Sequence, residues 1–182
     1  MNQASLNKSG IVAFRSRQRG ASLLEGIAYL GIAAIVILGA VSLLGSAFGN
    51  ARSNQASEEV VSLRTAVKKL YSGQTYPATI VSTLIAARAV PGSLVVDTDK
   101  KTVTNSWGGA VTVTAGPNGG SFVIGYPAVP QDVCINLVTG ANGWTRIDND
   151  GKTPITVFPV NAEAALGVCN DAAGNKLAFA AN

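Results

Sequence analysis

Hydrophobic residues are concentrated in one long run near the start of the chain. The run begins at Ala21, and no residue from Gly26 to Ala51 carries a charge. About 20 consecutive apolar residues are enough to cross the hydrocarbon core of a bilayer as a helix. Beyond the run, apolar residues recur at three- and four-residue steps among Val60, Val61, Leu63, Val67, Leu70 and Tyr71. This spacing predicts an amphipathic helix.

The two patterns together predict a single helix over 21–72 that ends before Gly73 and Pro77. At 1.5 Å per residue it would be about 78 Å long. Its first half is apolar on every side and its second half has one apolar face. Charged residues are expected on the other faces of the second half: Arg52, Glu58, Glu59, Arg64, Lys68 and Lys69.

Residues 77–182 have a different composition, rich in Gly, Asn, Thr, Val and Pro. The pattern predicts a short helix over 79–90, a hairpin connection over 115–120, and a helix over 132–139 for which a strand is the alternative. Predicted strands are 93–97, 102–105, 110–114, 121–126, 144–147, 155–158 and 176–180. The fold class is therefore α+β, with a small antiparallel sheet packed on the second half of the long helix.

The net charge of the chain comes from its first residues. The chain has 14 basic and 10 acidic side chains, and Lys8, Arg15, Arg17 and Arg19 precede the apolar run with no acidic residue among them. Without these four cations the remaining charges balance, so the basic composition does not indicate a nucleic-acid partner. By the positive-inside rule, the basic end stays in the cytoplasm and the C-terminal part lies outside. The apolar run is too long for a secretory signal peptide. A plain membrane anchor fits the run but does not explain the acidic Glu25 at its edge.

The residues around Glu25 resemble a known signal. A basic leader, the segment Gly20-Ala21-Ser22-Leu23-Leu24-Glu25 and the long apolar run resemble the class III signal of type IV prepilins. A 20-residue leader and the first residue Ala21 are similar to the type IVb subgroup. The segment Asn105-Ser106-Trp107-Gly108-Gly109 and the two late cysteines resemble PilS-type pilins of thin conjugative and enteric pili. The resemblance covers most of the chain and is strongest up to Tyr76.

The resemblance implies the type IV pilin fold and a division of the chain. A prepilin peptidase would cut between Gly20 and Ala21, on the cytoplasmic side. Residues 1–20 would be the removed leader, 21–48 the transmembrane and filament-core helix, 49–76 its amphipathic continuation, and 77–182 the globular head with a disulfide region at 134–169. The first mature residue of the family is commonly N-methylated. Whether Ala21 carries this modification does not follow from the sequence.

The resemblance also assigns a role to Glu25. Cleavage would create an α-amino group at Ala21, four residues before the carboxylate. A lone carboxylate is unfavourable among packed apolar helices, and a nearby ammonium compensates it. The family places this pair between neighbouring subunits. Ala21 and Glu25 are therefore the expected assembly residues.

The two cysteines, Cys134 and Cys169, are expected to form a disulfide. The head would face the periplasm, where disulfides form. Two cysteines leave one intramolecular pairing, and two buried free thiols are the alternative.

Few features of the sequence indicate an enzyme. The chain has no histidine, which excludes Ser–His and Cys–His nucleophile pairs and histidine metal ligands. Asp97-Thr98-Asp99 and Asp148-Asn149-Asp150-Gly151 lack the full spacing of a calcium loop and are interpreted as turns. Trp107-Gly108-Gly109 is interpreted as structural. No metal, cofactor or catalytic residue is expected.

The leading hypothesis is a major pilin precursor, held in the inner membrane of a Gram-negative bacterium and polymerised into an extracellular filament. The filament would serve attachment, mating-pair formation or aggregation. The implied partners are copies of the chain, the prepilin peptidase, an assembly ATPase, an inner-membrane platform and an outer-membrane secretin. Two alternatives stay open: a minor pilin or type II secretion pseudopilin, and a membrane-anchored periplasmic binding protein or enzyme.

Overall fold

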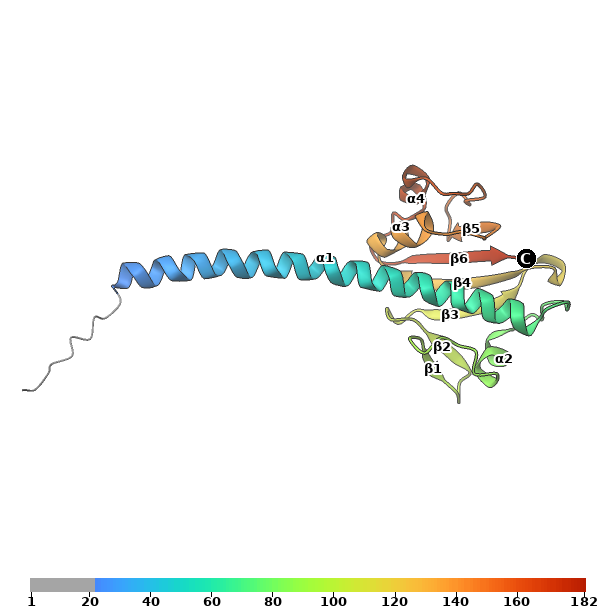
Figure 1. Ribbon diagram of the computed structural model, residues 1–182. Helices are drawn as coiled ribbons and strands as arrows, with labels where there is room; N and C mark the ends of the chain where they lie inside the picture. Colours follow the sequence, from blue (N-terminus) through green and yellow to red (C-terminus); the bar gives the residue numbers. More distant parts are fainter. Residues whose placement is uncertain (1–21) are drawn as a thin grey trace, which may run out of the picture. The chain divides into compact units, whose positions relative to one another are not determined.

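The computed structural model describes residues 22–182 of the chain (Figure 1). The predicted leader and the predicted cleavage site between Gly20 and Ala21 lie outside the described residues. The chain divides into two compact units, of which the first ends at Leu43 and the second comprises Leu44–Asn182.

Helix α1 extends from Leu23 to Leu70 and confirms the predicted long helix over these residues. It begins after Ser22, whose hydroxyl oxygen accepts a hydrogen bond from the backbone N–H of Glu25 at 3.2 Å. This contact satisfies one of the backbone donors that a helix start leaves free. At the other end, Gly73 has a φ of +74°, a conformation that glycine adopts without steric cost.

A six-stranded antiparallel sheet forms the centre of the second unit, in the order β1-β2-β3-β4-β6-β5. The long strand β4 lies between β3 and β6, and its side chains alternate between the two faces of the sheet. Phe122, Ile124 and Tyr126 point to the inner face and are fully buried. The strands are β1 (Val95–Asp97), β2 (Thr102–Thr104), β3 (Ala110–Ala115), β4 (Phe122–Val129), β5 (Arg146–Asn149) and β6 (Asn175–Ala181).

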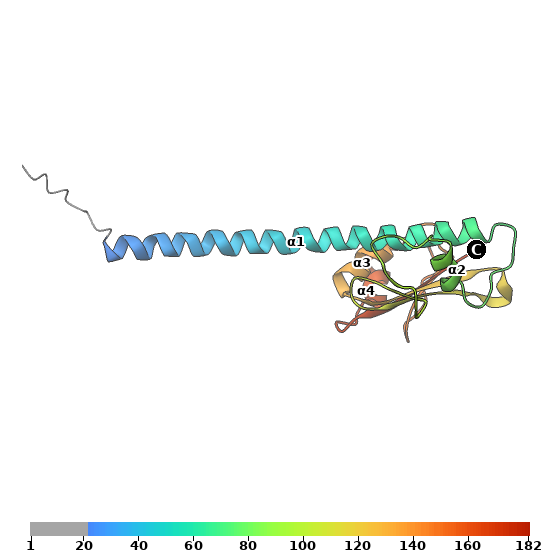
Figure 2. The same ribbon diagram turned by 90° about the horizontal axis from the view of Figure 1, so that it is seen from below.

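The second half of α1 crosses one face of this sheet (Figures 1 and 2). The residues that it buries there, at three- and four-residue steps, are Ala56, Val60, Leu63 and Val67. The predicted apolar stripe is confirmed except at Val61, which is exposed. Burial of each valine or leucine side chain contributes about 1.5–3 kcal/mol, so this stripe is a main source of the attachment between helix and sheet.

Three short helices complete the second unit. They are α2 (Val81–Ala86), α3 (Gln131–Thr139) and α4 (Ala162–Val168), and a 3₁₀ turn, η1 (Pro117–Gly119), connects β3 to β4. The predicted hairpin connection and the helical interpretation of 132–139 are confirmed. Helix α2 is shorter than the predicted 79–90, because Arg88 has a φ of +52° and the chain leaves the helical conformation there.

In the C-terminal third, one predicted strand is wrong and one helix was not predicted. No strand forms over 155–158, where Ile155 makes only an isolated bridge to Ile147. Pro154 and Pro159 flank this segment, and proline supplies no N–H to a ladder. Helix α4 was not predicted. Its local signal is Asn161, whose side-chain oxygen accepts a hydrogen bond from the N–H of Ala164 at 2.8 Å.

Candidate functional site

The first unit presents an apolar helix that the subunit itself does not cover. Among the described residues, α1 is the one helix long and apolar enough to cross a membrane, and none of its most apolar segment is buried within the chain. Its exposed large hydrophobic residues up to position 48 are Leu23, Leu24, Ile27, Tyr29, Leu30, Ile32, Ile35, Val36, Ile37, Leu38, Val41, Leu43, Leu44 and Phe48. A continuous apolar surface of this extent needs lipid or other protein to cover it.

Glu25 lies in the first turn of α1 and is exposed in the subunit. Its backbone N–H is held by Ser22, and its carboxylate oxygen Oε1 accepts a hydrogen bond from the hydroxyl of Tyr29 at 3.5 Å. A negative charge is favourable at the N-terminal end of a helix, where the helix dipole is positive. Ala21, the predicted partner of Glu25, lies outside the described residues, so their pairing stays a prediction.

Glu59 corrects the sequence interpretation, which placed it on the polar faces of the helix. Its side chain is buried, with a relative exposure of 1%. Oε1 accepts a hydrogen bond from Gln55 Nε2 at 2.9 Å, and Oε2 accepts one from the hydroxyl of Tyr126 on β4. The helix position explains the burial, because residue 59 follows Ala56 by three positions and precedes Leu63 by four. This spacing from Ala56 and Leu63 is the feature of the sequence that could have predicted the burial of Glu59.

The hydroxyl of Tyr126 is equally buried, and its pKa is raised well above the ordinary value. Burial is the main cause, and the hydrogen bond to Glu59 and its negative charge act in the same direction. The tyrosine is therefore neutral and can donate its proton to Glu59. This contact joins α1 to the central strand of the sheet through a polar pair within an apolar core.

Arg64 attaches the same helix to the loop that follows α3. Its Nη1 donates a hydrogen bond to the backbone oxygen of Asn142 at 2.6 Å, and its guanidinium lies 4.7 Å from the centre of the Trp144 ring. Cation–aromatic contacts of this kind stabilise by roughly 0.5–2 kcal/mol. Arg64 therefore fixes the loop between α3 and β5, which lies within the disulfide region.

Cys134 on α3 and Cys169 after α4 form a disulfide, and both are buried. The bond fastens α4 to α3. Beside it, the buried amide of Asn149 donates hydrogen bonds to the oxygens of Val168 and Asn175 at 2.7 and 2.9 Å. Asn175 in turn donates to the backbone oxygen of Val129 at 3.1 Å. No sequence pattern distinguishes these two asparagines from the others in the head.

The segment 105–109 has the structural role that the sequence suggested. Asn105 Oδ1 accepts hydrogen bonds from the N–H groups of Trp107 and Gly109, and its Nδ2 donates to the backbone oxygen of Pro127 at 2.6 Å. A side chain at position 109 would collide with this oxygen. The turn between β2 and β3 is thus fixed against β4.

The two acidic segments are also accounted for by local contacts. Asp97 accepts hydrogen bonds from the N–H groups of Asp99 and Lys100 at 3.1 and 3.0 Å, which makes a turn. Asp148 pairs with Arg146 at 2.7 Å. Within residues 22–182, no three His, Cys, Asp or Glu side chains gather in a way that could hold a metal ion.

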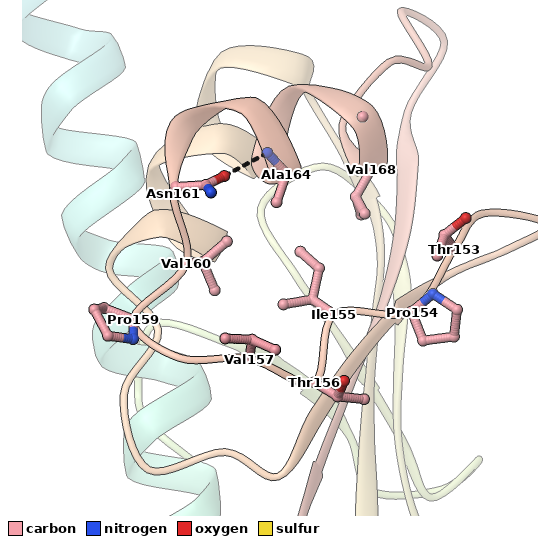
Figure 3. Close-up of a pocket in the computed structure, with 11 residues that line it drawn as sticks. Thr153, Pro154, Ile155, Thr156, Val157, Pro159, Val160, Asn161, Ala164 and Val168 are labelled. Carbon is pink, nitrogen blue, oxygen red and sulfur yellow. Dashed lines mark hydrogen bonds between the residues drawn. The ribbon is translucent and has the colours of Figure 1, made fainter.

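A pocket of about 360 Å³ opens between α4 and the segment that precedes it (Figure 3). The side chains of Ile155, Val157, Val160 and Val168 give it an apolar lining. Thr153, Thr156 and Asn161 are its polar lining residues, and Asn161 caps α4. The lining contains no carboxylate, amine or thiol, so the pocket offers no acid, base or cysteine nucleophile.

Comparisons with known proteins agree with this architecture. The family described as "PilS N terminal" matches residues 50–182. The chain is 32% identical over 158 residues to the "Major structural subunit of bundle-forming pilus" of Escherichia coli O127:H6 (strain E2348/69 / EPEC), which covers 81% of this chain and 80% of that protein.

Two solved structures are similar to the chain. The crystal structure of TcpA, a type IV pilin from Vibrio cholerae El Tor biotype, has a TM-score of 0.53 at 16% identity, over 72% of this chain and 99% of that one. The NMR structure of the type IVb pilin PilS from Salmonella typhi has a TM-score of 0.47 at 28% identity, over 70% of this chain and 94% of that one. The first shows a shared fold. With the family match over more than two thirds of its length, the chain belongs to the PilS family of type IVb pilins, as its sequence predicted.

Proposed function

We propose that this chain is the precursor of the major structural subunit of a type IVb pilus. The relative that it matches over 80% of its length is named a major structural subunit of such a filament. The observation that carries the proposal is the first half of α1, which is apolar on all sides and uncovered within the subunit. Bundling of these helices with copies of themselves would bury that surface in a filament core.

Each segment of the chain has a separate proposed role. Residues 1–20 are a leader that a prepilin peptidase removes, and 21–48 anchor the subunit in the inner membrane before they enter the filament core. Residues 49–76 continue the helix as an amphipathic segment, to which the head (77–182) is attached. The leader faces the cytoplasm and the head faces the periplasm. An assembly ATPase, an inner-membrane platform and an outer-membrane secretin then deliver the filament to the outside.

Glu25 is proposed to select the partner subunit. In the membrane its carboxylate lies at the edge of the apolar run, and in the filament it would pair with the α-amino group of Ala21 on an adjoining copy. The exposed position of Glu25 in the first turn of α1 supports this role. A role as a structural subunit also agrees with the contacts of the head, whose buried polar groups satisfy one another.

The test is N-terminal sequencing of material sheared from cells. Filaments whose subunits begin at Ala21 are expected. Cleaved subunits that remain in the cell envelope and never reach the sheared fraction would favour a minor pilin or a type II secretion pseudopilin. A subunit that begins at Met1 would indicate a membrane-anchored periplasmic protein, and one that begins after Gly45 would indicate a secreted protein. Only the first result agrees with the proposal.

A further inference from the structure

Among the described residues that follow Glu25 on α1, Tyr29 is the one polar side chain within helical reach of its carboxylate. Between Leu23 and Val41, Glu25 and Tyr29 are the only residues whose side chains form hydrogen bonds. They are four positions apart, the spacing that places two side chains next to each other on a helix. The rest of that stretch offers the carboxylate no side-chain donor.

The structure brings the two groups together. The hydroxyl of Tyr29 donates to Oε1 of Glu25 at 3.5 Å, while the hydroxyl oxygen of Ser22 accepts the backbone N–H of the same glutamate at 3.2 Å. Ser22 fixes the backbone of Glu25 in the first turn, and Tyr29 draws the carboxylate along the flank of the helix. A carboxylate has two oxygens, so a hydrogen bond to Oε1 leaves Oε2 able to accept from another donor.

The hydrogen bond between Tyr29 and Glu25 matters most when the carboxylate enters apolar surroundings. A polar group transferred to apolar surroundings without a hydrogen bond is unfavourable, and more so if it carries a charge. Water and lipid headgroups solvate Glu25 only while it lies at the membrane surface. When Glu25 moves into a bundle of apolar helices, its carboxylate loses the water and the headgroups. A hydrogen-bond donor on the same helix moves together with the carboxylate. Tyrosine suits this position, because its ring is apolar and its hydroxyl is polar.

We propose that Tyr29 is a positioning residue for filament assembly. Its hydroxyl holds the Glu25 carboxylate against the helix and directs the second oxygen outward, ready to accept the amino terminus of an adjoining copy. This inference rests on the proposed role of Glu25 and adds the residue that prepares it.

The experiment compares the filament yield of cells that carry wild type, Tyr29→Phe, Glu25→Asp or both substitutions, normalised to the amount of cleaved subunit in the membrane. Tyr29→Phe keeps the ring and removes only the hydroxyl. We expect its yield to fall roughly three- to tenfold, which corresponds to the loss of one hydrogen bond of ordinary strength. In the Glu25→Asp background the shorter carboxylate no longer reaches position 29, so the second substitution should have little further effect. Tyr71→Phe, just past the end of α1, is the control and should assemble normally.

A second measurement does not depend on assembly. In the purified chain in detergent micelles, the ¹³C signal of the Glu25 side-chain carboxyl, assigned with Glu25→Gln, should shift in Tyr29→Phe. An unchanged signal would overturn the proposal. An unchanged filament yield, or an equal loss of yield with and without Glu25→Asp, would overturn it as well. Failure of the proposed function is distinguishable, because then wild-type cells themselves would yield no sheared filaments. Failure of the proposed Glu25 role is distinguishable too, because then Glu25→Val would form normal filaments.

Discussion

Tyr126, in the centre of the sheet, donates a hydrogen bond to the buried carboxylate of Glu59 on α1. The two residues are 67 positions apart in the sequence. The apolar side chains around this contact, such as Val60 and Leu63, pack without directional bonds. A hydrogen bond is directional, so this pair, together with the contact of Arg64 with Asn142, helps to set the position of the head along the helix.

Glu59→Ala should destabilise the head strongly. The substitution leaves the buried Tyr126 hydroxyl without its acceptor, and an unsatisfied buried group costs about 1–3 kcal/mol. It also removes one of the two acceptors of the Gln55 amide, which keeps its contact with Ser106. We expect a loss of about 2–5 kcal/mol in the free energy of unfolding, measured by denaturant titration of the detergent-solubilised chain. Glu58→Ala is the matched control, because Glu58 is the neighbouring residue on the same helix and is exposed. A similar loss in both variants would contradict the assigned role.

The stability of the head should decrease at alkaline pH. The folded state raises the pKa of Tyr126, chiefly by burial, so above the ordinary tyrosine pKa of about 10 the unfolded chain loses a proton that the folded chain keeps. The stabilisation is complete below that pH and is lost as the pH rises, by up to about 1.4 kcal/mol per pH unit for one proton.

Denaturant titrations between pH 8 and 11 would measure this dependence. Tyr126→Phe should flatten it above about pH 10, whereas Tyr71→Phe should keep it. If the Tyr126→Phe variant keeps the full wild-type slope, another group is responsible for the alkaline loss.

Gly109→Ala should destabilise the turn between β2 and β3. A Cβ at this position would collide with the backbone oxygen of Pro127, which already accepts a hydrogen bond from Asn105 at 2.6 Å. Backbone atoms on both sides leave little room for adjustment, so we expect a loss of about 1–3 kcal/mol in thermal or denaturant unfolding. At Gly92 a Cβ meets nothing within 4 Å, so Gly92→Ala is the control and should be nearly neutral. Equal stability of the two variants would show that the turn moves more freely than its contacts indicate.

Substitutions of Glu25 test the assembly role directly. Glu25→Val should be cleaved after Gly20 and inserted in the membrane but should assemble poorly, because the ammonium of the neighbouring subunit then has no carboxylate. Glu25→Asp should be intermediate, since it keeps the charge on a shorter side chain. Filament yield in the sheared fraction, with the mature N-terminus checked by mass spectrometry, measures both steps. Normal filaments from Glu25→Val would remove this residue from assembly.

Local patterns predicted well wherever one segment carries its own signal. The long helix, the hairpin connection at 115–120 and most strands follow from periodicity and turn residues. The strand predicted over 155–158 failed because its β-branched residues have no partner strand beyond the bridge of Ile155 to Ile147. Helix α4 was missed because it is short and its capping residue, Asn161, is one of many asparagines in the head.

The sequence by itself determined the long apolar helix and the position of Glu25 at its edge, because these features depend on composition and on the fixed geometry of a single helix. The hydrogen bond between Tyr29 and Glu25 was recognised only in the structure. Only the tertiary structure decided that Glu59 is an interior residue, that Arg64 holds the loop at Asn142, and that Asn149 and Asn175 support the disulfide region. The physical reason is that burial of a polar group is acceptable only when distant residues supply its hydrogen-bond partners, and those partners meet only in the folded chain.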